Sequence, residues 1–192
     1  MTRLSIASSL LALLLAPCIQ AQGPSFKLGA QAAVGVPFSG PISIATGDFN
    51  GDGIPDLAVS NYSGASVEVI LGSGDGRFEQ HRTFPVGATV RQLALADLDG
   101  DANLDAVAVC VDPNIVVVLK GKGDGTFERP VRWELPSRGI AILAADFNGD
   151  AIPDLAVAQD QSLLIALGAG DTTFRSTPLI PFGAEPVRES CS

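Results

Sequence analysis

The chain has 192 residues, 46% of them hydrophobic and 17% charged, and its formal net charge is −9. Twelve Lys and Arg with no basic stripe make nucleic acid a poor partner. The length is sufficient for a single domain with its own core.

The N-terminus has the pattern of a secretory signal. Arg3 provides a positive start, an apolar run too short to span a bilayer follows, and a cleavage site fits after Ala21. We therefore expect residues 1–21 to be a signal peptide and the protein to be secreted, periplasmic or on the cell surface. Leu15–Cys18 also resembles a lipoprotein box, but a proline directly before Cys18 disfavours a lipid anchor there.

The rest of the chain divides by an internal repeat. A Gly/Ala-rich lead-in at 22–40 precedes the repeat, and a C-terminal tail at 186–192 follows it. Between them, residues 41–185 are predicted to form three units, at about 41–89, 90–138 and 139–185.

Each unit contains four short strand signals. The first precedes an acidic segment, the second follows it, the third is an apolar run, and the fourth starts at Phe78, Phe127 or Phe174. An Asp-Gly or Asp-Thr turn separates the third signal from the fourth, and we interpret it as a turn and not as a ligand. The spacing predicts an all-β fold, a partial β-propeller of about three four-stranded antiparallel blades.

The acidic segments are nine-residue loops that recur every 49 residues. Loop 1 is Asp48–Asp56, loop 2 is Asp97–Asp105 and loop 3 is Asp146–Asp154. Positions 1, 3, 5 and 9 of the three loops hold ten Asp and two Asn. Asp/Asn/Gly hairpin turns without a metal are the alternative interpretation, but turn chemistry does not require a carboxylate at position 9 in every copy.

Oxygen ligands at this spacing are typical of a calcium site, because calcium takes six to eight oxygens. An EF-hand is excluded, since position 12 is Val59, Ala108 or Val157 where that loop needs Glu. By analogy with the EF-hand, the backbone carbonyl of position 7 would be a further ligand. We expect about three Ca²⁺ sites, with ligands at Asp48, Asn50, Asp52, Ile54 and Asp56; Asp97, Asp99, Asp101, Asn103 and Asp105; and Asp146, Asn148, Asp150, Ile152 and Asp154.

The segment Gly47–Val59, with the turn Leu71–Phe78, resembles an FG-GAP repeat of the VCBS type. The resemblance covers about 40–185. It implies integrin-α-like propeller blades with calcium in the loop between the first two strands of each blade. The pattern prefers Gly at position 6, as at Gly53, where loops 2 and 3 have Ala102 and Ala151. We expect loop 3, which also has Asn at position 3, to be the weakest site.

The number of units is low for this family, whose members usually have about seven. A chain of three predicts either missing blades or a ring closed by homo-oligomerisation.

The pattern as a whole predicts a secreted calcium-binding module with structural calcium and a protein or glycan partner, in an adhesion role. One alternative is a truncated structural fragment of a larger repeat protein. A polysaccharide-acting propeller enzyme is a weaker alternative, because the single histidine, His81, has no Ser or Cys partner indicated. We therefore expect no enzymatic activity, no nucleic-acid partner and no membrane span.

Overall fold

The computed structural model describes residues 40–182, and this part of the chain contains thirteen strands and no helix. No segment of it is therefore a helix able to cross a membrane. The predicted signal peptide, the possible anchor at Cys18, nearly all of the lead-in and the tail at 186–192 lie outside the described residues.

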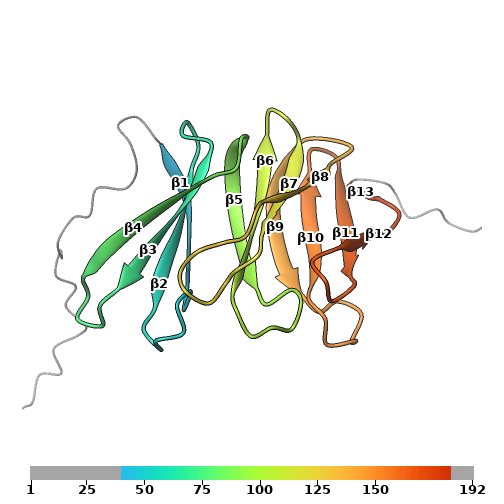
Figure 1. Ribbon diagram of the computed structural model, residues 1–192. Coiled ribbons are helices and arrows are strands. Elements are labelled where there is room, and N and C mark those ends of the chain that lie inside the picture. The colour runs from blue at the N-terminus through green and yellow to red at the C-terminus, as the bar shows by residue number, and fades with distance from the viewer. Residues whose placement is uncertain (1–39, 183–192) are drawn as a thin grey trace, which may run out of the picture.

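The strands form three antiparallel sheets that lie side by side in chain order (Figure 1). Blade 1 consists of β1 (Pro41–Gly47), β2 (Asp56–Asn61), β3 (Ser66–Gly72) and β4 (Phe78–Pro85). Blade 2 consists of β5 (Thr89–Ala96), β6 (Asp105–Val111), β7 (Ile115–Leu119) and β8 (Val131–Glu134). Blade 3 consists of β9 (Gly139–Ala145), β10 (Asp154–Gln159), β11 (Ser162–Gly168), β12 (Phe174–Ser176) and β13 (Ile180–Pro181).

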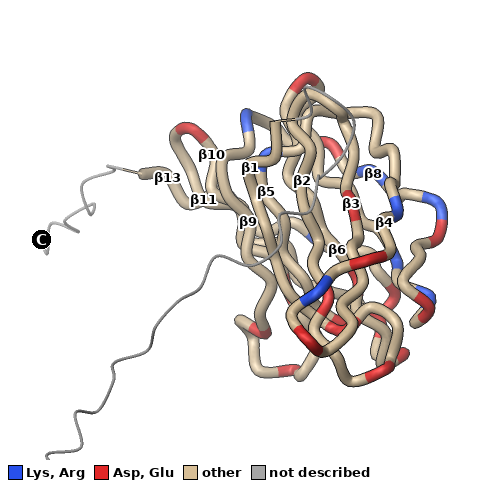
Figure 2. The backbone as a smooth tube through the Cα atoms, turned by 90° about the vertical axis from the view of Figure 1, so that its left-hand side faces the viewer, with Lys and Arg blue, Asp and Glu red and all other residues tan. Residues whose placement is uncertain are grey.

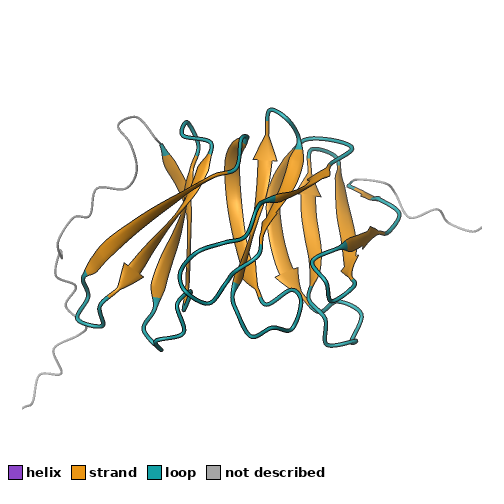
Figure 3. Cartoon of the chain, in the orientation of Figure 1, coloured by secondary structure: helices purple, strands orange, loops and turns teal. Residues whose placement is uncertain are grey.

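The prediction of an all-β chain built from antiparallel, propeller-like blades is confirmed. Within each sheet the first four strands follow chain order, and the first strands of neighbouring blades, β1, β5 and β9, lie next to one another. Loops and turns, and no helix, connect the strands of the described residues (Figure 3).

The fourth strands of blades 1 and 3 start at Phe78 and Phe174 as predicted, but that of blade 2 starts later, and the one in blade 3 is short. In blade 2, Phe127 makes only an isolated bridge with Gly121, and β8 starts at Val131. In blade 3, β12 ends at Ser176, and β13 makes a separate short pairing with β11. A proline interrupts both segments, at Pro130 and Pro178, and proline has no backbone N–H to donate to a strand ladder.

The core consists of two interfaces between blades. Every residue of β6 and β7 is buried, because blade 2 has a neighbour on both faces. Alternate residues of β6 therefore go to different clusters: Ala108 packs toward blade 1, and Val107 and Val109 pack toward blade 3. This arrangement explains why the central strands are apolar at every position instead of at every second position.

Loop 1 contacts the neighbouring blade directly. The ring of Phe49 meets Phe127 edge to face at 5.8 Å between centroids, and Phe84 meets Phe127 at 4.8 Å. The Gly125 N–H donates to the Phe49 carbonyl at 2.7 Å, and Arg82 donates to the Asp124 carbonyl at 2.6 Å. The first loop of blade 1 is thus joined to the third turn of blade 2.

Candidate metal-binding loops

All three acidic loops lie at the same end of the array, each between the first and second strands of its blade (Figure 1). Figure 2 shows Asp and Glu positions gathered at this end. The strand register fixes each loop at its base, because position 9 pairs with the residue that precedes position 1. The three pairs are Asp56 with Gly47, Asp105 with Ala96, and Asp154 with Ala145.

The aspartate at position 9 is fully buried in every loop. In loop 1, Asp56 Oδ2 accepts the Phe49 N–H at 2.9 Å, and Oδ1 accepts the Gly72 N–H at the end of β3 at 2.8 Å. The same two bonds recur at Asp105 and Asp154, at distances from 2.7 to 3.0 Å. Position 9 therefore joins the start of its loop to the third strand without any metal.

The glycine that donates to position 9 is required by close packing. A Cβ on Gly72 would lie 2.4 Å from the Pro55 carbonyl oxygen, far inside van der Waals contact. Gly121 and Gly168 meet the equivalent carbonyl at 2.3 Å each. The sequence analysis did not identify these three glycines. Their signal was a glycine that recurs at or just after the end of the third strand of each blade.

The aspartate at position 1 is held by backbone N–H groups of its own loop. Asp48 Oδ1 accepts from Gly51 at 2.7 Å, and Oδ2 accepts from Gly53 at 2.8 Å. The bond from Gly53 is the main reason that the pKa of Asp48 is lowered. Loop 3 repeats this arrangement, and the Ala151 N–H lowers the pKa of Asp146.

Position 6 adopts a left-handed backbone in all three loops. The φ angle is 78° at Gly53 and 67° at both Ala102 and Ala151. This conformation directs the N–H of position 6 to the carboxylate of position 1, at 2.9 Å in loops 2 and 3. The two alanines therefore carry a backbone strain that glycine avoids, which explains why the repeat pattern prefers Gly at position 6.

Positions 3 and 5 bond to each other in loops 1 and 3. Asn50 Nδ2 donates to Asp52 Oδ2 at 2.9 Å, and the Ile54 N–H donates to Asp52 Oδ1 at 2.8 Å. Asn148 and Asp150 form the same pair in loop 3. Both carboxylate oxygens of position 5 are thus engaged inside the loop in these two blades.

Loop 2 differs, because an ammonium group lies against its positions 3 and 5. Lys120 Nζ contacts Asp99 Oδ2 closely and Asp101 Oδ2 at 3.3 Å. These contacts, with Asp99 first, raise the pKa of Lys120. The pKa of Asp101 is lowered, chiefly by the Asn103 N–H and also by Lys120. The sequence analysis did not identify Lys120 as a functional residue. Its signal was a charged residue directly after an apolar third strand, which occurs only in the second unit.

Three of the predicted ligands of loop 2 converge. One ligand oxygen from each of Asp97, Asp99 and Asp105 lies within 4.8 Å of the others. Asp99 Oδ1 is buried and has no hydrogen-bond partner. Burial raises the pKa of Asp105, and the nearby charges of Asp99 and Asp101 add to that effect. An all-oxygen set with one unbonded buried oxygen fits a hard cation such as calcium.

Loops 1 and 3 do not form such a group within residues 40–182. Position 3 is Asn in both, and the carboxylate of position 5 is bonded to Asn50 or Asn148. Backbone N–H groups hold positions 1 and 9 in all three loops, and loop 2 alone adds a third carboxylate, Asp99, beside them. The position 7 residues, Ile54, Asn103 and Ile152, donate their N–H groups to position 5, and their carbonyls stay predicted ligands.

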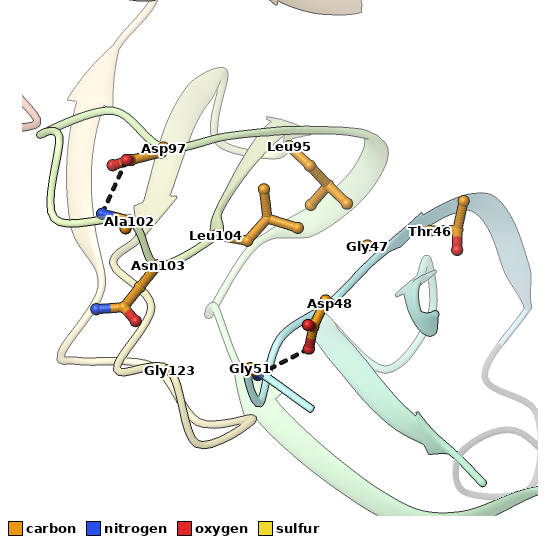
Figure 4. Close-up of a pocket in the computed structure, with 10 residues that line it drawn as sticks. All are labelled: Thr46, Gly47, Asp48, Gly51, Leu95, Asp97, Ala102, Asn103, Leu104 and Gly123. Atoms are coloured by element: carbon orange, nitrogen blue, oxygen red, sulfur yellow. Dashed lines mark hydrogen bonds between the residues drawn. The ribbon is translucent and has the colours of Figure 1, made fainter. Parts of the chain in front are cut away.

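A pocket of about 460 Å³ lies between loops 1 and 2 (Figure 4). Asp48 and Gly51 line it from loop 1, and Asp97, Ala102 and Asn103 line it from loop 2. Both aspartates point into their own loops, where each is hydrogen-bonded to a backbone N–H. The pocket therefore separates two loops and is not itself a cage of carboxylates.

Comparison with known proteins gives one family. Residues 48–108, which include loops 1 and 2, match the model of the FG-GAP-like repeat. A search of the curated proteins finds no match. Among solved structures, a chain of the Photorhabdus luminescens Tc holotoxin pore is similar, with 21% identity and a TM-score of 0.46 over 73% of this chain. The match covers 7% of that chain.

Proposed function

We propose that this chain, whose residues 48–108 match the FG-GAP-like repeat, is a calcium-binding repeat module. The bound ion fixes the acidic loops of the blades. The observation that carries this proposal is the convergence of Asp97, Asp99 and Asp105 around an unbonded buried oxygen. Loops 1 and 3 are assigned the same role, because their position 1 and position 9 carboxylates are held in the same way.

Calcium suits these loops on chemical grounds. The donors are carboxylate and amide oxygens, with no histidine or cysteine among them, and oxygen-only sets favour hard cations. Each loop concentrates at least three carboxylates over nine residues, and a dication would neutralise most of that charge. Backbone N–H groups already orient positions 1 and 9, so less chain entropy is lost when the ion binds.

We further propose that the module is exported and binds a protein or glycan, in an adhesion role. The N-terminal pattern supports export, and the outside of a cell supplies the calcium that such loops need. A binding role is favoured over an enzymatic one, because the one histidine, His81, lies exposed on β4 and belongs to none of the acidic loops.

Calorimetric titration of the full chain with CaCl₂, combined with thermal unfolding in EDTA, tests the calcium proposal. We expect saturable binding and a midpoint of unfolding that rises with calcium, because a ligand of the folded state stabilises it. MgCl₂ at the same ionic strength is the control for screening of charge. An Asp160→Asn variant, which changes an exposed aspartate outside the loops, is the control for net charge. Equal midpoints in EDTA and calcium would contradict the proposal.

A second candidate is a structural part of a larger array, either with further blades or with copies of itself. Position 2 of the loop carries the observation: Phe49 is 4% exposed and Leu98 is 2% exposed, but Phe147 is 46% exposed. The first two residues pack between blades, and the third lies on blade 3, which no described blade follows. Light scattering after size exclusion tests this candidate, since an array of associated copies has a mass above that of one chain.

A further inference from the structure

Lys120 is the one cation that the structure brings into contact with an acidic loop at positions 3 and 5, among residues 40–182. Its side chain follows the end of β7 and is 32% exposed, and the side chain of Asp99 beneath it is 11% exposed. The ammonium bridges Asp99 Oδ2 and Asp101 Oδ2. It therefore engages two oxygens that a calcium ion in this loop would use.

The same place in the other blades is apolar. Gly72, Gly121 and Gly168 all donate to the position 9 aspartate, so the residues before them are structurally equivalent. Those residues are Leu71, Lys120 and Leu167. Position 3 is also charged in loop 2 alone, since Asp99 stands where loops 1 and 3 have Asn50 and Asn148.

The two differences compensate in charge. Loops 1 and 3 each have three carboxylates, and loop 2 has four carboxylates with one ammonium, so all three sets carry a formal −3. An added carboxylate alone would raise the attraction of loop 2 for a dication. A tethered ammonium close to the ion opposes that attraction, since like charges at a few Å repel strongly even near a protein surface.

We propose that Lys120 is an internal cation that partly replaces calcium in loop 2. This inference rests on the proposed function, and it concerns the selectivity among the loops. Loop 2 is held in its folded geometry by its own ammonium group, so it requires calcium less than loops 1 and 3 do. Calcium binding at loop 2 has to displace Lys120 from Asp99 and Asp101 or bind beside it. Loop 2 is therefore the weakest of the three calcium sites, in place of loop 3, which the sequence alone favoured for that rank.

The test is a Lys120→Leu variant of the full chain, which installs the residue found at Leu71 and Leu167. We expect its loop 2 to bind calcium about tenfold more tightly than the wild type, because the competing charge is gone. A titration of the wild type should then show two tight sites, and a titration of the variant should show three. In EDTA the variant should unfold at a lower temperature than the wild type, and calcium should remove that difference.

Two further variants keep the result interpretable. Lys122→Leu makes the same change of net charge at an exposed residue two positions away, and it should leave both measurements unchanged. A double variant, Asp99→Asn with Lys120→Leu, gives loop 2 the same side chains at positions 1, 3, 5 and 9 as loops 1 and 3, and it keeps Ala at position 6 as loop 3 does. We expect it to fold in EDTA if the single variant does not, and its loop 2 to bind calcium as loop 3 does.

The results that would overturn the inference differ from the result that would overturn the proposed function. Weaker calcium binding by Lys120→Leu would overturn the inference and make Lys120 a group that orients the ligands. Three equal sites in the wild type would also overturn it while the proposed function stands. If neither protein binds calcium, the proposed function is wrong and the inference fails with it.

Discussion

Each acidic loop has a base and a tip with different surroundings. The base is the position 9 aspartate, which is fully buried and bonded to the backbone of two elements. The tip is positions 3 and 5, whose side chains in loops 1 and 3 bond to each other near the solvent. One acidic motif therefore has two parts with different surroundings: the base carboxylate holds the fold, and the tip side chains are the ones that would rearrange around a bound ion.

Removal of a base carboxylate should have the largest effect. Asp56→Ala leaves the Phe49 and Gly72 N–H groups without an acceptor at a buried site. We expect a loss of about 2–5 kcal/mol in the free energy of unfolding, because unsatisfied buried donors are costly. Urea unfolding in EDTA measures it, with Asp52→Ala at the tip as the control. Equal losses in the two variants would end the distinction between base and tip.

A tip substitution should act through calcium alone. In EDTA, Asp52→Ala should change the free energy of unfolding by about 0.5 kcal/mol or less, as for an exposed side chain. At a calcium concentration of about 100 times the dissociation constant, the variant should lack about 2.7 kcal/mol of stabilisation that the wild type gains at loop 1. Unfolding curves with and without calcium give both values. A calcium response equal to that of the wild type would show that position 5 is not a ligand.

The turn between tip and base should respond to glycine. Ala102→Gly and Ala151→Gly relieve a φ of 67° and should each stabilise the chain by about 0.5–1 kcal/mol in EDTA. Gly53→Ala is the matched reverse change, since a Cβ there meets no atom within 4 Å and only the backbone is affected. It should destabilise by a similar amount. Stabilisation by Gly53→Ala would show that position 6 carries no backbone strain.

The stability contributions of Asp48 and Asp105 should change in opposite directions as the pH is lowered. The pKa of Asp48 is lowered in the folded chain, so its stabilisation is complete above the ordinary Asp pKa and is lost as the pH falls through the folded value. The pKa of Asp105 is raised by burial, so its contribution declines as the pH rises from the ordinary value through the raised one. Urea midpoints of Asp48→Asn and Asp105→Asn in EDTA, between about pH 3 and pH 6, should diverge from the wild type in opposite directions. Parallel curves would contradict these signs.

The sequence predicted those features that depend on local patterns. Three loops at a fixed spacing and the strands around them follow from residues a few places apart. The partners of position 9 were not predicted, because Gly72 is distant in the chain from Asp56 and reaches it only through the pairing of β2 with β3. Lys120 was missed for the same reason: β6–β7 pairing places it against loop 2. The short fourth strands of blades 2 and 3 result from Pro130 and Pro178, and the regular spacing of the repeat did not indicate this effect.

The contact between loop 1 and the turn of blade 2 has a mechanical consequence. The Gly125 N–H bonds to the Phe49 carbonyl at this first joint, but among residues 40–182 no backbone bond joins Leu98 to the corresponding turn of blade 3. The stability of a linear array is approximately the sum of the stability of each repeat and the interaction energies between neighbouring repeats. The two junctions are therefore unequal, and under tension we expect blade 3 to detach first while blades 1 and 2 remain together as a pair.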